Sequence, residues 1–139
     1  MENNLQVDKK KFGNGEKRYQ KLRLLLYSED FDFAQSFSLY FQKDYHKIIT
    51  VNDQETLLQI ISLLNPEIII LDNIVNESLL TLVSKIKNSC PHSKVFIFTS
   101  HAISQQEIVN RLNKIVDRIF YQPIDLSEFN QALNFYTAD

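Results

Sequence analysis

Five short apolar runs, each followed by a longer segment with helical spacing, constrain the fold of this chain more than any other feature. Short apolar runs that alternate with helical segments predict βα units and a mainly parallel sheet. The sequence contains no internal repeat that would indicate another architecture. We therefore predict an α/β domain, a doubly wound (βα)5 sheet in three layers, with strands at 22–27, 47–51, 68–71, 95–98 and 119–121.

Apolar residues recur at helical intervals between these runs. The segment after the first run carries the most aromatic of these stripes, and the last segment carries another. Side chains three and four residues apart share one face of a helix, so we expect both stripes to pack in the core. Their members are Phe33, Ala34, Phe37, Tyr40 and Phe41 in the first stripe, and Phe129, Ala132, Leu133 and Tyr136 in the last.

Helix boundaries are indicated by capping residues and by proline. Either Asn52 or Asp53 can cap the second helix, and Pro66 is expected to close it. Ser104 and Glu107 have the spacing of a capping box for the fourth helix. These signals place the helices between the predicted strands, in agreement with the apolar pattern.

Residues 1–20 lack this periodicity and contain both glycines of the chain. A polar segment of this kind is typical of a flexible leader, so we assign one domain to residues 21–139. We interpret the basic stretch from Lys9 to Arg23 as a solvated tail, with contact to an acidic partner as the alternative. Because residues 21–139 contain no glycine, they offer no glycine-rich loop for a nucleotide phosphate.

Composition argues against several classes of protein. The formal charge of -2 and the pI near 5.9 provide no overall basic field, so neither nucleic acid nor a membrane surface is an expected partner. No run reaches the roughly 20 apolar residues that cross a bilayer, and the polar N-terminus does not resemble a signal peptide, so we expect a cytoplasmic protein. Cys90 is the one cysteine, which excludes an internal disulfide and a cysteine-rich zinc site.

Polar residues follow the predicted strands at their carboxyl ends. In an open parallel sheet these ends meet at one edge, where ligands bind. Asp72 ends the third run, and Glu29 and Asp30 follow the first, so we expect an acidic pocket. Carboxylates in one pocket repel one another unless protons or a hard cation intervene, which suggests Mg²⁺ with Glu29 and Asp72 as ligands. Thr99 would add a hydroxyl donor beside Asp72.

Four segments resemble the receiver domains of bacterial two-component response regulators: RLLLYSED at 23–30, NPEIIILD at 65–72, VFIFTSH at 95–101 and RIFYQPID at 118–125. The resemblance extends over about residues 21–133 and implies a flavodoxin-like fold. It also implies a phosphoacceptor at Asp72, an acidic pocket that includes Glu29 and Asp30, and a switch hydroxyl at Thr99.

The chain departs from the family pattern at the same strand ends. Family members carry two adjacent acids after the first strand, where this chain has Ser28 and Glu29, although Asp30 could substitute. The family's lysine before the proline of the fifth strand is replaced by Gln122, ahead of Pro123. A neutral amide therefore stands where a cation would pair with the phosphoryl group. The loop NIVNES after the third strand is also shorter than usual.

The resemblance and its departures together predict a signalling module without catalytic activity. We favour a pseudo-receiver of the two-component (phosphorelay) class that binds protein partners, with weak or absent phosphorylation at Asp72. The alternative is a stand-alone receiver that is phosphorylated at Asp72 with Mg²⁺. A flavodoxin-like enzyme is a third hypothesis, opposed by the acidic, glycine-free segment after the first strand. The expected partner is a histidine kinase or a downstream signalling protein, and a homodimer is left open.

Overall fold

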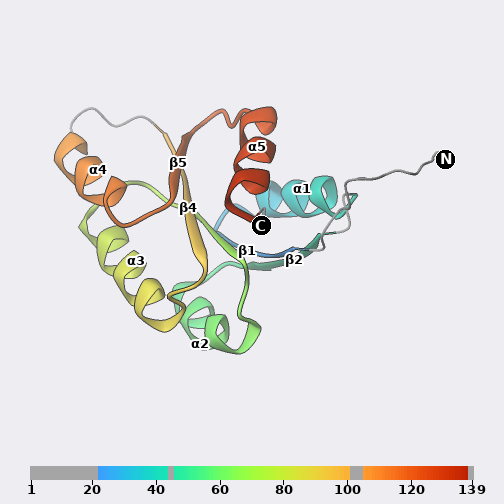
Figure 1. The fold of residues 1–139 in the computed structure, drawn as a ribbon, viewed down its shortest axis with the longest axis horizontal. Coiled ribbons are helices and arrows are strands. Elements are labelled where there is room, and N and C mark those ends of the chain that lie inside the picture. The colour runs from blue at the N-terminus through green and yellow to red at the C-terminus, as the bar shows by residue number, and fades with distance from the viewer. Residues whose placement is uncertain (1–21, 44–45, 101–104, 138–139) are drawn as a thin grey trace.

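The computed structural model describes residues 22–43, 46–100 and 105–137, which form one α/β arrangement (Figure 1). The predicted leader, residues 1–20, lies outside the described residues. Within them, strands and helices alternate in the predicted (βα)5 order. The strands are β1 (Arg23–Ser28), β2 (Lys47–Val51), β3 (Ile68–Asp72), β4 (Lys94–Thr99) and β5 (Arg118–Tyr121). The helices are α1 (Phe31–Gln42), α2 (Gln54–Leu64), α3 (Glu77–Ser89), α4 (Gln106–Asn113) and α5 (Leu126–Thr137).

The sheet is parallel throughout, with the strand order β2-β1-β3-β4-β5. Helices α1 and α5 cover one face, and α2, α3 and α4 cover the other (Figure 1). The aliphatic residues 68–71 of the central strand β3 are all buried, as expected for a strand covered on both faces. The predicted doubly wound, flavodoxin-like, three-layer fold is therefore confirmed. Within the described residues, no helix is long and apolar enough to span a bilayer.

The face covered by α1 and α5 has an aromatic core. Phe129 of α5 is fully buried, and the centre of its ring lies 5.1 Å from that of Phe41 and 5.4 Å from that of Phe98. Phe37 joins the same cluster, which confirms most of the aromatic stripe predicted for α1. Tyr40, also predicted for this core, is 38% exposed because it stands on the flank of the helix, where its ring packs edge-on against Phe41.

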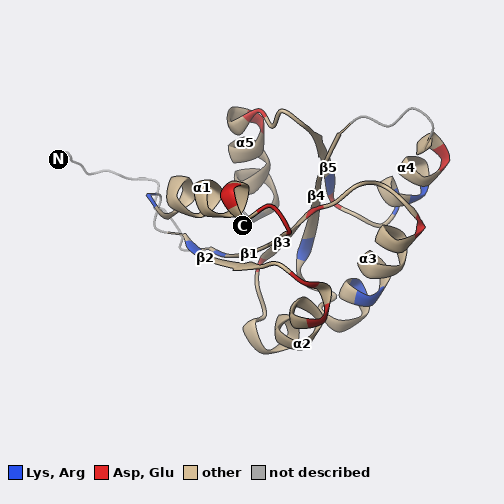
Figure 2. Ribbon diagram, turned by 180° about the vertical axis from the view of Figure 1, so that it is seen from behind, with Lys and Arg blue, Asp and Glu red and all other residues tan. Residues whose placement is uncertain are grey.

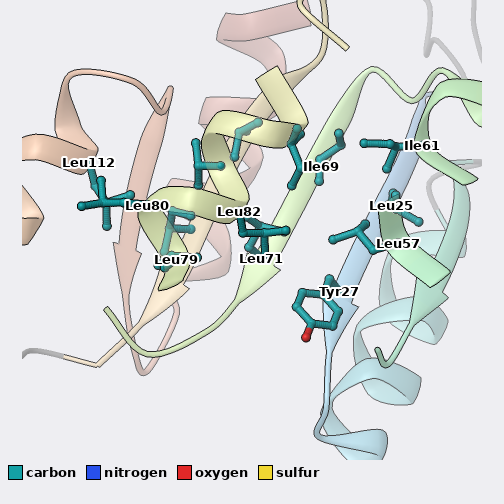
Figure 3. Packing of buried hydrophobic residues seen from close by; sticks show 14 of the residues in the cluster. Leu25, Tyr27, Leu57, Ile61, Ile69, Leu71, Leu79, Leu80, Leu82 and Leu112 are labelled. Atoms are coloured by element: carbon teal, nitrogen blue, oxygen red, sulfur yellow. The ribbon is translucent and has the colours of Figure 1, made fainter. Parts of the chain in front are cut away.

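The opposite face has an aliphatic core (Figure 3). Successive side chains of a strand point to opposite faces of the sheet. Leu25 and Tyr27 of β1 therefore lie in this core, whereas Leu24 and Leu26 join the aromatic one. The residues that pack here from the other elements include Ile69 and Leu71 of β3, Leu57 and Ile61 of α2, Leu79 and Leu82 of α3, and Leu112 of α4.

The helix ends follow the predicted signals in α2 but not in α4. Asp53 caps α2, because its carboxylate accepts a hydrogen bond from the Thr56 N–H at 2.8 Å. Asn65 ends the helix with a φ of 49°, a left-handed conformation that asparagine tolerates. The N-cap of α4 is Gln105, whose side chain makes no capping bond, so the cap predicted at Ser104 is wrong by one position. Ser104 itself lies outside the described residues.

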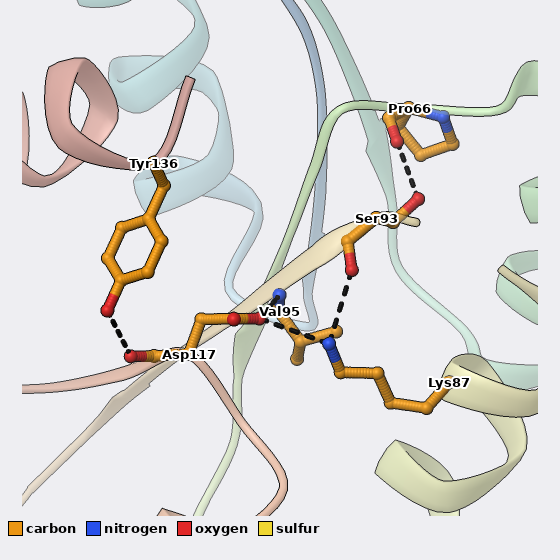
Figure 4. A network of polar contacts seen from close by, with 6 residues as sticks. All are labelled: Pro66, Lys87, Ser93, Val95, Asp117 and Tyr136. Atoms are coloured by element: carbon orange, nitrogen blue, oxygen red, sulfur yellow. Dashed lines mark hydrogen bonds and ion pairs between the residues drawn. The ribbon is translucent and has the colours of Figure 1, made fainter. Parts of the chain in front are cut away.

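A polar network joins several elements at the amino end of the sheet (Figure 4). One carboxylate oxygen of Asp117, just before β5, accepts hydrogen bonds from Lys87 Nζ at 3.1 Å and from the Val95 N–H at 2.8 Å. The carbonyl of Asp117 accepts a hydrogen bond from the Tyr136 hydroxyl at 2.8 Å. Because Lys87 belongs to α3, Val95 to β4 and Tyr136 to α5, one residue connects helices on both faces to the sheet.

We expect Asp117→Ala to lower the free energy of unfolding by about 2 kcal/mol, because it removes the carboxylate that accepts from the Val95 N–H and pairs with the Lys87 ammonium. Urea unfolding measures this loss. The matched control is Arg111→Ala, which breaks the ion pair between Arg111 and Glu77. This pair has the same length as that between Lys87 and Asp117, 3.1 Å, but its side chains are 52% and 70% exposed. That control should cost less than about 0.5 kcal/mol. Equal losses for the two variants would show that the network does not stabilise the fold.

Candidate functional site

The strand register places Asp72 beside Ser28. Asp72 is the last residue of β3, and its partners in the neighbouring strands are Ser28 of β1 and Phe98 of β4. Partner residues of adjacent parallel strands send their side chains to the same face of the sheet. The side chains of Ser28 and Asp72 therefore meet at the carboxyl edge, on the face that α1 and α5 cover.

Two neutral groups donate hydrogen bonds to the Asp72 carboxylate. The Ser28 hydroxyl donates to Oδ2 at 2.7 Å, and Nε2 of Gln122 donates to Oδ1 at 3.1 Å. Ser28 is buried, whereas Gln122 is exposed. These three residues, called the Asp72 triad below, join β1, β3 and the segment that follows β5. Each oxygen of the carboxylate thus has a donor from the protein, and both donors are uncharged.

The two acidic residues predicted beside Asp72 make different contacts. Asp30 caps α1 through its side chain, and its backbone N–H donates to Ser28 Oγ at 3.1 Å. Asp30 is therefore connected to the Asp72 triad through Ser28. Glu29 is exposed, and one of its carboxylate oxygens lies 3.5 Å from the Tyr27 hydroxyl.

A backbone hydrogen bond joins the residues predicted at the ends of β4 and β5, Thr99 and Gln122. The N–H of Gln122 donates to the carbonyl of Thr99 at 2.7 Å, and the peptide bond from Gln122 to Pro123 is cis. Thr99 is buried, and among the described residues no hydrogen bond joins its hydroxyl to Asp72. Gln122 thus contacts both Thr99, through its backbone, and Asp72, through its side chain, while the switch role of Thr99 stays a prediction.

Burial raises the pKa of the Asp72 carboxyl above its ordinary value of 3.8, and the negative charge of Asp30 raises it further. The hydrogen bonds from Ser28 and Gln122 act in the opposite direction. Because the folded-state pKa is higher than the unfolded one, the folded chain binds this proton more tightly. The resulting stability is fully present below the unfolded pKa and is lost as the pH rises through the folded pKa.

Asp72→Asn should therefore gain stability relative to the native chain as the pH rises from about 4 to about 7, because asparagine carries no charge that burial penalises. Urea unfolding of both chains at the two pH values measures the change. Asp53→Asn is the matched control: hydrogen bonds from Thr56 lower the pKa of Asp53, so this variant should lose stability relative to the native chain as the pH rises. If both variants gained, or both lost, stability relative to the native chain as the pH rises, the raised pKa of Asp72 would be refuted.

Among the described residues, the side chains around Asp72 do not form a complete set of ligands for a divalent cation. Mg²⁺ requires about six oxygen ligands in near-octahedral geometry. Within 22–43, 46–100 and 105–137, no group of three or more His, Cys, Asp or Glu side chains could hold a metal ion. Both oxygens of Asp72 accept hydrogen bonds from Ser28 and Gln122, and the carboxylate of Asp30 caps α1. These contacts give no support to the predicted pair of ligands, Glu29 and Asp72.

The edge of the sheet that carries Asp72 is rich in acidic residues (Figure 2). The helices begin at this edge, and an acidic side chain in the first turn interacts favourably with the helix dipole. The acidic residues of the first turns are Asp32, Glu55, Glu77, Glu107 and Glu128. Ion pairs with Arg111 and Arg118 neutralise two of them. The remaining negative charge opposes the approach of an anionic phosphodonor.

The hydrogen bond between Ser28 and Asp72 is the contact that sequence reasoning missed. The sequence identified Ser28 only as the replacement of an expected acid. A signal was nevertheless present, because both residues follow apolar runs that pair in the central part of a doubly wound sheet. Aligning the ends of those two runs would have placed the hydroxyl next to the carboxylate.

No protein-family model and no curated protein sequence matches this chain. Solved structures do match it. A pilus assembly-related protein from Burkholderia pseudomallei has a TM-score of 0.72 and 19% identity, over 88% of this chain and 96% of that one. A two-component response regulator from Clostridium difficile has a TM-score of 0.71 and 20% identity, over 84% and 95%. A response regulator from Thermotoga maritima has a TM-score of 0.70 and 15% identity, over 86% and 100%.

The similarity at these low identities establishes the fold. The chain has the (βα)5 fold of response regulator receiver domains, with nearly the full length of each compared chain covered. The class that the fold defines is thus the receiver-like α/β domain, as the sequence resemblance predicted. The Asp72 triad lies at the carboxyl edge, where folds of this type bind their ligands.

Proposed function

We propose that this chain is a receiver-like signalling module of the two-component (phosphorelay) class that acts through protein contacts and accepts little or no phosphoryl group at Asp72. The observation that carries the proposal is the pair of neutral donors, Ser28 and Gln122, on the carboxylate. A phosphoryl group adds a charge of roughly -1.5 to -2, which is stabilised when cationic donors face it. A hydroxyl and an amide supply hydrogen bonds but no positive charge.

The second candidate is a receiver that is phosphorylated at Asp72. It is favoured by the position of Asp72 at the end of the central strand, where the carboxylate is only partly buried. In that reaction a carboxylate oxygen of Asp72 would attack the phosphorus of acetyl phosphate, and the bond from phosphorus to acetate would break. The attacking oxygen would use a lone pair that does not accept the hydrogen bond from Ser28 or Gln122, and that hydrogen bond would reduce its nucleophilicity.

Titration of the ¹⁵N-labelled full chain with Mg²⁺ and beryllofluoride, a phosphoryl mimic, tests the proposal. We expect the amide spectrum to stay unchanged, because the described residues of the site supply neither a cation nor a complete set of metal ligands. Asp72→Asn serves as the control and should behave like the native chain. Shifts around Ser28 and Gln122 that disappear in Asp72→Asn would overturn the proposal in favour of the phosphorylated receiver.

We propose that the module contacts its partner, a histidine kinase or a downstream signalling protein, through α1 and α5. Both helices expose large apolar side chains: Phe31 is 72% exposed and Leu39 is 62% exposed on α1, and Phe135 is 75% exposed on α5. Exposed apolar side chains of this size contribute to protein interfaces when they gather in one patch. The two helices lie on the same face of the sheet (Figure 1), and α1 begins directly after Asp30, whose backbone N–H donates to Ser28.

A further inference from the structure

Strand β2 ends the sheet on one side, so that among the described residues its only neighbouring strand is β1 (Figure 1). The N–H of Lys47, the first residue of β2, donates to the Leu22 carbonyl at 2.8 Å. Along a strand, successive residues direct their backbone groups to opposite sides. Lys47 and every second residue after it therefore bond toward β1, whereas the N–H and C=O groups of Ile48 and Thr50 point away from the sheet.

This edge lacks the features with which proteins usually prevent the addition of another strand. Proline, a β-bulge or a charge in the middle of the strand serves that purpose. The residues of β2, KIITV, include no proline and no charge after Lys47. Their register against β1 is continuous, so the strand has no bulge. Residues 48–51 are all β-branched, which favours the extended backbone that a further strand can join.

The backbone groups of this edge are complementary to those of the same edge in a second copy. An antiparallel pair with its two-fold axis at Ile49 places Ile48 opposite Thr50 of the second copy. Opposite residues whose backbone groups face each other exchange two hydrogen bonds. The axis generates this pair twice, so four hydrogen bonds form. The side chain of Ile49, partly exposed at this edge, faces Ile49 of the second copy in a β-branched cross-strand pair.

The charges at the two ends of β2 favour the same arrangement. Lys47 begins the strand, and Asp53 follows it with an extended backbone, φ -142° and ψ 152°. In the antiparallel pair, Asp53 of the second copy is the diagonal neighbour of Lys47, within reach of a long side chain. Both side chains are exposed, and neither forms an ion pair with another described residue. The two-fold axis thus brings two Lys–Asp pairs together.

We propose that β2 is a self-association surface, through which two copies of this chain pair their edge strands antiparallel and join their five-stranded sheets into one. An interface with two-fold symmetry uses the same patch on both copies, and β2 supplies hydrogen-bond donors and acceptors, apolar side chains and charges of both signs within one short segment. The inference goes beyond the proposed function and does not depend on it, because no residue of this edge belongs to the Asp72 triad.

Sedimentation of the full chain over a series of concentrations tests the proposal. We expect the native chain to pass from monomer to dimer as the concentration rises. Thr50→Pro removes an N–H that points away from β1, at an edge position where proline is tolerated, and should remain a monomer. Thr50→Val retains the N–H and should dimerise like the native chain. A native chain that stays monomeric, or a dimer that persists in Thr50→Pro, would overturn the proposal.

Lys47→Glu tests the same interface without altering the backbone, and it decides the question if Thr50→Pro does not fold. The substitution replaces two attractive pairs by two repulsive ones, so we expect the dimer dissociation constant to rise roughly tenfold. Asp53→Asn, which retains a residue suited to cap α2, should weaken the dimer in the same direction. A dissociation constant that is unchanged in Lys47→Glu would contradict the antiparallel pairing.

Hydrogen exchange separates a second copy from other occupants of the edge. We expect the amide protons of Ile48 and Thr50 to exchange more slowly as the concentration of the chain rises, in step with the dimer fraction. Protection that is already complete in the monomer would show that another segment of the same chain covers β2, and this result would refute the self-association surface.

Discussion

Phe129→Ala should lower the free energy of unfolding by about 3–5 kcal/mol, the range for removing a fully buried phenylalanine from a packed core. The ring of Phe129 is fully buried and has aromatic neighbours on α1, β4 and β5. Its loss leaves a cavity between the helix layer and the sheet and also removes edge-to-face contacts. Urea unfolding followed by circular dichroism measures the change.

Phe135→Ala is the matched control for this prediction. Phe135 belongs to the same helix and has the same side chain, but it is 75% exposed. Its replacement should change the free energy of unfolding by no more than about 0.5 kcal/mol. Comparable losses in the two variants would mean that the aromatic cluster under α5 is not the core of this face.

Introducing a cation at the site should increase phosphorylation, which we propose to be weak or absent in the native chain. In Gln122→Lys an ammonium replaces the amide that donates to Asp72. A hydrogen bond to a charged group contributes about 1.5–3 kcal/mol, which corresponds to roughly a tenfold to hundredfold change in rate. We expect a gain of this order in the incorporation of phosphate from acetyl phosphate with Mg²⁺. Because Gln122 is exposed, the substitution should leave the fold intact.

Adding Ser28→Asp to Gln122→Lys should increase the incorporation further, since it supplies the second of the two adjacent acids that receiver domains carry. Ser28 is 1% exposed, so urea unfolding must first show that the double variant is folded. Gln122→Met, which has a similar length and no charge, is the control for the single variant. If Gln122→Lys incorporates no more phosphate than Gln122→Met, the missing cation is not what prevents the reaction.

The fold could be predicted because the strands are short and separated by strongly periodic helices. The buried run from Ile68 to Leu71 identified the central strand, and β2 has the predicted bounds of 47–51. Other strand ends differ by about one residue, since the last residue of a strand is fixed by its partner rather than by its own hydrophobicity. The cap of α4 was misplaced for a similar reason: the sequence offers a serine, but the helix begins one position later.

The position of the candidate site was predicted from the sequence, whereas the hydrogen bonds of its side chains were not. The sequence placed Asp72 at the carboxyl edge and identified Gln122 as a neutral replacement, and the structure shows these two side chains in contact. The bond from Ser28 to the carboxylate was missed, because it emerges only when the ends of β1 and β3 are aligned in register. Nor could the sequence separate Glu29 from Asp30, since local backbone geometry decides that Asp30 caps α1.

The intact mass of the native chain after incubation with acetyl phosphate and Mg²⁺ tests the central claim most directly. With Ser28 and Gln122 as the donors to Asp72, we predict that the mass stays that of the unmodified chain, while Gln122→Lys in the same assay gains one phosphoryl group. A single phosphoryl group on the native chain that is absent from Asp72→Asn would contradict the account.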